Sequence, residues 1–264
     1  MGAAGITGVV TVRPYGSLRD FLPPGRRGLE ISVRTDGRAP VRHIAGAAGI
    51  PFPEIEAVLL DGEPAGLDAV PAPGSRLALY PSSVHGLLPA CPALRPPLGR
   101  PPSFILEAGL GGLARILRLL GFHADYRPDG DPALLVEKAS SSGSVLLSRD
   151  RGLLMRRGVV HGRWVRSGDP REQAIEVAVS LGLAPEIRLF RFCSKCGGEI
   201  DCVPKIEIDH LLEPLTREHY DEFWRCRRCG RIYWAGSHLP ALKSLLEGIS
   251  AACRTALTPE PSME

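Results

Sequence analysis

The sequence lacks the segments that would carry a chain into or across a membrane. No basic-then-apolar leader is visible, and no apolar run reaches the roughly 18 residues needed to cross a bilayer. Lysine is scarce, because nearly all of the positive charge is arginine, and the formal net charge is only +3. A charge this small does not by itself indicate a nucleic-acid partner. We therefore expect a cytoplasmic protein with no membrane partner.

The cysteine content argues against a secreted disulfide framework. There are seven cysteines, an odd number, and four of them form two C-x-x-C-G motifs, "FCSKCGG" and "WRCRRCGR". In each motif two thiolates reach one metal ion, and the glycine allows the tight turn. A redox C-x-x-C needs no second pair. We predict a structural zinc site whose ligands are Cys193, Cys196, Cys226 and Cys229.

Composition divides the chain into three modules. A hydrophobic content of 44% supports a packed core. The proline-dense stretch "PACPALRPPLGRPP" cannot form a helix and is typical of a stiff linker. The predicted boundaries are a small mixed domain over 1–88, the linker over 89–102, an α/β domain over 103–190, a zinc ribbon over 191–240, and a C-terminal helix and tail over 241–264.

The N-terminal module has a β-β-α-β-β order. "GVVTVRPYGSL" and "LEISVRTDG" alternate as paired strands, "APVRHIAGAAGIP" is a short helix, and "IEAVLLDGEPA" and "SRLALYP" complete the sheet. This order resembles the ubiquitin-like β-grasp fold of small sulfur-carrier proteins. Those carriers end in an activated Gly-Gly tail, whereas this module continues into the linker. We therefore expect a docking or structural module with an unknown protein partner.

The middle module alternates strands with helices. "SFILEA", "SVLLS" and "VVHGRWVR" are predicted strands, and the helices are "LGGLARILRLLGF", "PALLVEKASSSG" and "DPREQAIEVAVSLGL". The alternation predicts a parallel sheet covered by helices on both faces. Arg115 and Arg118 fall on the face of the first helix opposite its leucines, three residues apart.

Carboxylates follow the strands of this module. Glu107 ends the first strand, Asp150 follows the next apolar strand, and Asp169, Asp129 and Asp131 lie in nearby turns. The carboxyl ends of parallel strands meet at one edge of a sheet, and hard oxygen ligands suit Mg²⁺ or Mn²⁺. This pattern is typical of metal-assisted phosphodiester hydrolysis. Structural roles remain open, since Asp150 and Asp169 fit helix N-caps and "DGD" is an ordinary turn.

The segments "FILEAGLGGLARILRLLGFHADYRPDGDPALLVEKA", "VLLSRDRGLL" and "DEFWRCRRCGRIYWAGSH" are similar to the Mut-seven C-terminal RNase family. That family has a PIN-like nuclease fold, a zinc ribbon and, in many members, a preceding β-grasp domain. The resemblance implies a metal-dependent endoribonuclease that acts on RNA. It also implies a catalytic set of Glu107, Asp129, Asp131, Asp150 and Asp169, with Ser148 and Arg149 as the polar residues that flank Asp150.

Two positions depart from the family pattern. Glu107 stands where an aspartate is usual, and Gly112 stands where a lysine is usual. These departures keep open a non-catalytic RNA- or ribosome-binding protein with a degenerate PIN-like site. A protein-interaction module built on the β-grasp domain is a third hypothesis.

Arginines and aromatics surround the second C-x-x-C-G motif. Arg227 and Arg228 lie between its cysteines, with Trp224 before them and Tyr233 and Trp234 after. Arginines beside aromatics suit RNA phosphates and unpaired bases. The alternative is that the aromatics pack the ribbon core and the arginines shield thiolate charge. We predict RNA contacts at Arg227 and Arg228, and at Arg115, Arg118, Ser148 and Arg149 of the nuclease module, with tRNA and the ribosome as candidate partners.

Overall fold

The computed structural model describes residues 8–82, 90–236 and 239–256. The chain forms two compact units. The first comprises Met1–Leu98 and Ser148–Trp164, and the second comprises Gly99–Leu147 and Val165–Glu264. The predicted boundary between 88 and 89 and the predicted tail over 257–264 lie outside the described residues.

The first unit contains a five-stranded sheet in the order β2-β1-β5-β3-β4. β1 pairs antiparallel with β2 and parallel with β5, and β3 pairs antiparallel with both β4 and β5. The strands are β1 (Gly8–Pro14), β2 (Ile31–Thr35), β3 (Ala57–Leu60), β4 (Glu63–Pro64) and β5 (Arg76–Tyr80). With the helix α1 (Val41–Ala47), this arrangement confirms the predicted β-grasp domain.

Alternation along β1 explains why this sheet has one buried face. Val10 and Val12 are fully buried, whereas Val9 is exposed and Thr11 is half-buried, as expected for side chains that point to opposite faces of a strand. The apolar side of α1 packs on the same core, where Ile44 is 1% exposed. The apolar spacing that predicted the helix therefore marks its packed face.

The segment Ser148–Trp164 belongs to this first unit, although it is far from the β-grasp domain in sequence. It contains the short helix α4 (Arg151–Leu154) and the strand β9 (Gly162–Trp164). The backbone N–H of Trp164 donates to Glu54 Oε1 at 2.6 Å, and Arg163 donates to the carbonyl of Pro53 at 2.5 Å. No pattern in the sequence predicts this grouping.

Trp164, at the end of the segment Ser148–Trp164, also contacts residues near the start of that segment. Its ring lies 4.9 Å from the ring of Phe21, and the guanidinium of Arg151 lies 5.2 Å above it. Arg151 also donates to the carbonyl of Phe21 at 2.8 Å. The indole N–H of Trp164 donates to the carbonyl of Arg149 at 3.2 Å, so the residues that precede α4 are tied to β9.

The second unit contains three parallel strands with β6 in the middle. β6 (Phe104–Leu106) pairs with β7 (Ala124–Tyr126) and with β8 (Val145–Ser148). The helices α2 (Gly111–Leu119) and α5 (Pro170–Leu181) lie on one side of these strands, and α3 (Pro132–Ser142) lies on the other. This confirms the predicted parallel sheet with flanking helices. All three residues of β6 are buried, which explains its unbroken apolar run.

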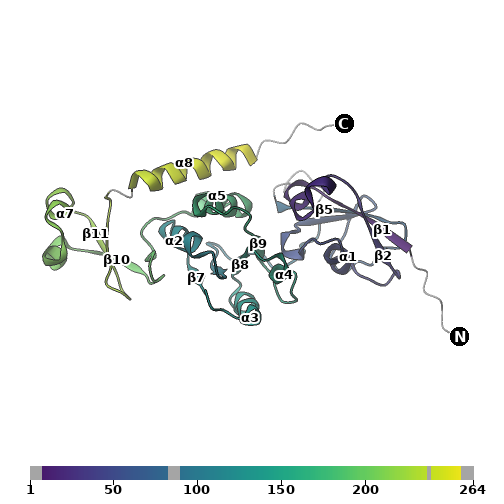
Figure 1. Cartoon of the computed structure of the whole chain (residues 1–264), viewed down its shortest axis with the longest axis horizontal. Coiled ribbons are helices and arrows are strands. Elements are labelled where there is room, and N and C mark those ends of the chain that lie inside the picture. The colour runs from purple at the N-terminus through teal and green to yellow at the C-terminus, as the bar shows by residue number, and fades with distance from the viewer. Residues whose placement is uncertain (1–7, 83–89, 237–238, 257–264) are drawn as a thin grey trace. The chain divides into compact units, whose positions relative to one another are not determined.

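The cysteine region forms an antiparallel sheet in the order β10-β11-β12 within the same unit. The strands are β10 (Ile200–Val203), β11 (Phe223–Cys226) and β12 (Ile232–Trp234), and the long connection holds α6 (Lys205–Ile208) and α7 (Pro214–His219). Val203, Ile208, Leu212 and Phe223 make its small core. The helix α8 (Leu239–Ala256) follows and packs along α5 (Figure 1).

Short 3₁₀ helices complete the secondary structure. They are Gly16–Phe21, Pro24–Arg26, Phe52–Glu54, Ala184–Glu186 and Asp209–Leu211. Among the described residues, no helix combines the length and the apolar character needed to cross a membrane.

The packing of Trp164 gives a testable prediction. Trp164→Ala should lower the free energy of unfolding by roughly 2–3 kcal/mol, less than for a fully buried tryptophan because this ring is only half-buried. Amide exchange of residues 148–164 should rise at the same time. The measurements are urea unfolding and hydrogen exchange with mass spectrometry. Trp234→Ala, at an exposed tryptophan of the second unit, is the matched control. Equal effects of the two substitutions would contradict this role of Trp164.

Candidate functional site

The four cysteines of the two C-x-x-C-G motifs converge. Their sulfur atoms all lie within 4.8 Å of one another. Cys193 and Cys229 are 3.6 Å apart at sulfur, and Cys196 and Cys226 are 3.5 Å apart. A tetrahedral zinc ion with Zn–S bonds of about 2.3 Å requires sulfur–sulfur separations of about 3.8 Å. The donor set and the spacing therefore fit a closed tetrathiolate site for zinc.

Each motif turns back on itself so that backbone amides face sulfur. The amide of Cys196 points to the sulfur of Cys193 at 3.5 Å, and the amide of Arg228 points to the sulfur of Cys226 at 3.4 Å. Gly197 and Gly230 have φ angles of +72° and +71°, a conformation that favours glycine. This is the physical reason for the glycine that follows each pair.

A tyrosine supports the first of these thiols. Burial works against a charged sulfur at Cys193, but hydrogen bonds from Tyr233 and from the Cys196 amide dominate and lower the pKa of Cys193 to about 6. The Tyr233 hydroxyl donates to the sulfur at 3.0 Å and accepts from the backbone N–H of Ser194 at 3.0 Å. Tyr233 thus has the ribbon role that the sequence left open for its aromatics.

Trp224 has a similar structural role. Its ring stacks on Phe190 with centroids 4.5 Å apart and planes 4° from parallel. Trp234 is 37% exposed and is the more accessible of the two tryptophans.

The two arginines between the second pair of cysteines differ in their partners. Arg227 donates to both carboxylate oxygens of Asp201, at 2.5 and 2.7 Å, and to Glu199 at 2.9 Å. Arg228 donates to the backbone carbonyl of Cys196 at 3.1 Å. Within the described part of the chain, Arg228 forms no ion pair with a carboxylate, so its charge is the less compensated of the two.

Arg118 is buried, although the helical pattern places it on the face of α2 opposite the leucines. It is 8% exposed, and its Nε donates to the carbonyl of Ala124 at 2.9 Å. Its NH1 group donates to the carbonyls of Ser194 and Lys195, each at 3.3 Å. Burial lowers the pKa of Arg118. The side chain joins α2 and β7 to the first cysteine motif, and Arg115 on the same helix is exposed.

The predicted carboxylates of the second unit lie after a strand, in a turn and at two helix N-termini. Glu107 directly follows β6 and is half-buried, and Asp129 is exposed. Asp131 caps α3, because its Oδ1 accepts from the backbone N–H of Ala133 at 2.6 Å. Asp169 caps α5 in the same way, with the backbone N–H of Arg171 at 2.9 Å. The N-cap interpretation of Asp169 is thus correct, whatever else this carboxylate does.

Ser148, Arg149 and Asp150 lie in the first unit. Ser148 is fully buried, and its hydroxyl donates to the carbonyl of Asp150 at 2.9 Å and accepts from the Asp150 N–H at 2.8 Å. Oδ1 of Asp150 accepts from the backbone N–H of Gly152 at 2.7 Å and so caps α4. Arg149 is exposed, and its carbonyl is bound by Trp164.

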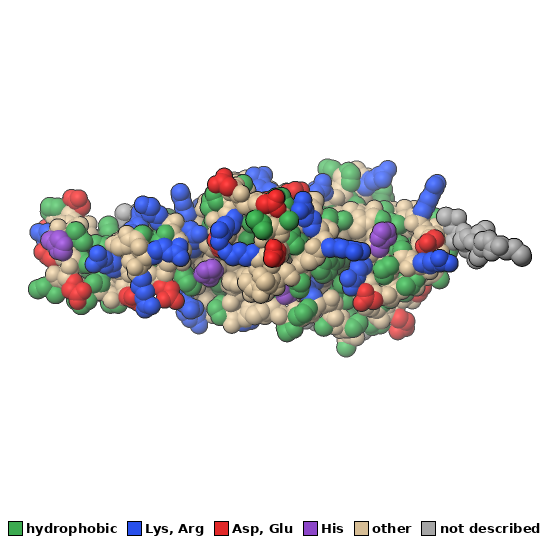
Figure 2. Space-filling view, turned by 90° about the horizontal axis from the view of Figure 1, so that it is seen from below, with side chains coloured by type: hydrophobic (Ala, Val, Ile, Leu, Met, Phe, Trp, Pro, Cys, Tyr) green, Lys and Arg blue, Asp and Glu red, His purple; other side chains and the backbone are tan. Residues whose placement is uncertain are grey.

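Among the described residues, the four cysteines form the group of His, Cys, Asp or Glu side chains that lies close enough to share an ion. The carboxylate site for Mg²⁺ or Mn²⁺ stays a prediction. On the face shown in Figure 2, Lys and Arg side chains are interspersed with Asp and Glu, in keeping with the small net charge.

Sequence reasoning missed three elements of these sites. Trp164 was not singled out, the burial of Arg118 was not expected, and the group of Asp125, Arg127 and Lys138 was overlooked. Asp125 pairs with Arg127 at 3.1 Å and also with Lys138. A charged residue in the middle of a short strand was the available signal, since it requires a partner when it lies beside a core.

Two family models match successive parts of the chain. The profile of the Mut7-C RNAse domain matches residues 102–246, and that of the Mut7-C ubiquitin matches residues 7–85. A search of curated proteins found no match. The crystal structure of H. volcanii small archaeal modifier protein 1 is 27% identical over 28% of this chain and 97% of its own. Its TM-score of 0.22 supports no conclusion about the fold.

The metal centre gives the second prediction. The purified protein should contain a single zinc ion per chain, and Cys226→Ser should abolish zinc binding and unfold the ribbon, because binding and folding of such sites are coupled. Metal content by plasma emission spectrometry and amide exchange of residues 191–236 are the measurements. Cys202→Ser is the control, since this exposed cysteine lies on β10 outside the cluster. Loss of zinc in both variants, or in neither, would contradict the assignment of ligands.

Proposed function

Because the chain belongs to the Mut7-C RNAse domain family, we propose that it is a metal-dependent endoribonuclease that hydrolyses RNA phosphodiester bonds. The observation that carries this proposal is the extent of the match. Residues 102–246 include the parallel sheet, its strand-end carboxylate Glu107 and the four cysteines. The family description indicates a nuclease-like function, and the activity, the metal and the residues are our proposal.

The proposed catalytic set is the one predicted from the sequence. Glu107, Asp129, Asp131 and Asp150 would bind Mg²⁺ or Mn²⁺, and Asp169 is the further acid of the set. Such an ion supplies a nucleophilic water and neutralises charge on the scissile phosphate. The donors fit this chemistry, since carboxylate oxygens are the ligands that these ions prefer. The four cysteines are soft ligands and serve the ribbon instead.

Preorganisation of Asp150 supports its place in this set. Its carboxylate is oriented by the amide of Gly152, its backbone is held by the buried hydroxyl of Ser148, and Trp164 holds the neighbouring carbonyl of Arg149. A ligand whose surroundings fix it loses little entropy when it binds an ion. The three caps at Asp131, Asp150 and Asp169 each use Oδ1.

RNA contacts are proposed for exposed cations. Arg115 and Arg149 are exposed in the nuclease module, and Arg228 is exposed on the ribbon. Arg118 contributes by positioning, because its guanidinium is used on backbone carbonyls. Zinc has a structural role only, since a closed tetrathiolate leaves no position for water.

A non-catalytic RNA- or ribosome-binding protein is the second candidate. Two observations favour it. N-capping provides a structural reason for Asp131, Asp150 and Asp169 that needs no metal. At Gly112, a Cβ atom would approach the ring of Pro170 to 2.6 Å, so local packing disfavours the lysine that the family usually has there.

The third prediction tests catalysis. Asp150→Asn should lower the rate of RNA cleavage with Mn²⁺ or Mg²⁺ on the order of 100-fold or more, since even a partner outside the metal's own ligands contributes up to about that factor. Asparagine still caps a helix, so the fold of α4 should be preserved. Cleavage is measured on a labelled single-stranded RNA. Asp68→Asn, a highly exposed carboxylate of the same unit, is the control. Equal cleavage by wild type and Asp150→Asn would remove the proposed site.

The fourth prediction concerns RNA affinity. Arg228→Gln should weaken RNA binding and reduce the slope of log K against log salt by about one, because one phosphate contact is lost. Arg227→Gln should have the smaller effect, since Asp201 and Glu199 already bind its guanidinium. Fluorescence anisotropy at several salt concentrations measures both. Unchanged affinity in both variants would exclude a role of the ribbon in RNA binding.

A further inference from the structure

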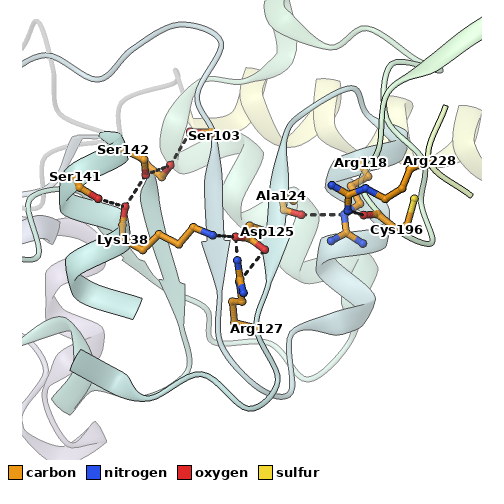
Figure 3. Close-up of polar contacts among 11 residues, drawn as sticks. Ser103, Arg118, Ala124, Asp125, Arg127, Lys138, Ser141, Ser142, Cys196 and Arg228 are labelled. Carbon is orange, nitrogen blue, oxygen red and sulfur yellow. Dashed lines mark hydrogen bonds and ion pairs between the residues drawn. The ribbon is translucent and has the colours of Figure 1, made fainter. Parts of the chain in front are cut away.

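A pocket of about 460 Å³ lies in the second unit, and its described lining includes none of the predicted catalytic carboxylates. Figure 3 shows several of its polar side chains. The residues that directly precede β6, β7 and β8 line this pocket; they are Ser103, His123 and Ser144. Cys196 and Gly197 of the first cysteine motif line it as well. Because these strands are parallel, their amino ends share one edge of the sheet. Glu107 follows β6 at the opposite edge.

Cations outnumber carboxylates on the walls of this pocket. Asp125 of β7 lies between Lys138 and Arg127 and pairs with both, as Figure 3 shows. Burial alone would raise the pKa of Asp125, but its bonds with Lys138 and Arg127 lower it, so the carboxylate is charged. Two cations share one anion, and the group therefore carries a net positive charge.

Two further arginines lie on the side of the cysteine motif. Arg118 and Arg228 both line the pocket. With zinc bound, the four thiolates would carry two net negative charges, which Arg118 and Arg228 would partly offset from the pocket side. Lys138 and Arg127 against Asp125 then leave an excess of one positive charge in the pocket.

Hydroxyl groups complete the site. Ser103 and Ser144 are hydrogen-bonded at 2.7 Å, and Ser144 and Ser142 are also 2.7 Å apart. Because Ser142 donates to the carbonyl of Lys138, Ser144 donates to Ser142 and Ser103 donates to Ser144, so a phosphate oxygen would accept a hydroxyl proton in place of one of these bonds. Ser142 lies at the end of α3, and its hydroxyl donates to the carbonyl of Lys138 at 2.7 Å.

We propose that this pocket is a binding site for a phosphate monoester, supplied either by a free nucleotide or by the terminal phosphate of an RNA strand. Lysine, arginine and hydroxyl groups are the side chains that bind phosphate oxygens most strongly. The volume lies within the range for small-molecule sites and exceeds what a bare phosphate fills. The free-nucleotide source is independent of the nuclease proposal, and the RNA-end source rests on it.

Asp125 has a defined role in this site. It holds Lys138 and Arg127 in place and reduces their charge, so it limits affinity for an anion while ordering the donors. The substitution Asp125→Asn removes this competing charge. A residue with a purely structural role would not strengthen binding when it is changed, and this gives the proposal a distinctive test.

The fifth prediction is measured by isothermal titration calorimetry on the full-length, zinc-loaded protein without added Mg²⁺ or Mn²⁺, so that no cleavage is involved. Adenosine monophosphate and inorganic phosphate are the probes. Lys138→Met should weaken binding about tenfold, because one charge-assisted contact with the phosphate is lost. Asp125→Asn should strengthen binding severalfold, because Lys138 and Arg127 no longer pair with a competing carboxylate. Lys243→Met on α8, outside the pocket, is the matched control and should bind like wild type.

The source of the phosphate is decided by competition. If a 5′-phosphorylated oligonucleotide displaces adenosine monophosphate and its 5′-hydroxyl counterpart does not, the site binds an RNA end. If only adenosine monophosphate binds, the site takes a free nucleotide. Absence of saturable binding by either probe and by the phosphorylated strand, or equal weakening by Lys138→Met and Lys243→Met, would overturn the proposal. Neither result would bear on cleavage by Asp150, which is assayed separately.

Discussion

The packing of Trp164 is the interaction on which the organisation of the first unit depends. The segment Ser148–Trp164, which begins at the last residue of β8, belongs to the same compact unit as the β-grasp domain. Trp164 contacts Phe21 with its ring, Glu54 with its N–H and the carbonyl of Arg149 with its indole. The ubiquitin-like domain therefore supports the segment that carries Asp150. This gives the domain a structural role that does not need the Gly-Gly tail of a sulfur carrier.

A comparable connection holds the second unit together. The cysteine region has a core of only a few apolar residues, which is too small to be stable without a metal or a neighbour. Arg118 supplies a link by donating to the carbonyls of Ser194 and Lys195 from the side of the sheet. Metal binding and this buried arginine thus act on the same turn. The walls of the pocket are consequently ordered by both the sheet and the ribbon.

Local signals in the sequence predicted much of this architecture. Alternation predicted β1, the Asp169-Pro170 pair predicted the start of α5, and the spacing of the cysteines predicted their cluster, because each pattern depends on residues within a few positions. The contacts of Trp164 with residues more than 100 positions away have no such pattern. The burial of Arg118 could not be predicted for the same reason. The periodicity of α2 describes one helix, and the ribbon that covers its other face is encoded 76 residues later.

Capping and metal binding are compatible roles for the strand-end aspartates. A cap needs one carboxylate oxygen, and in Asp131, Asp150 and Asp169 that oxygen is Oδ1. A negative charge at this position is also favoured by the helix dipole. An asparagine preserves the cap and loses the charge, whereas an alanine loses both. Stability and cleavage must therefore separate in the asparagine variants if these carboxylates bind a metal, and must change together if capping is their whole role.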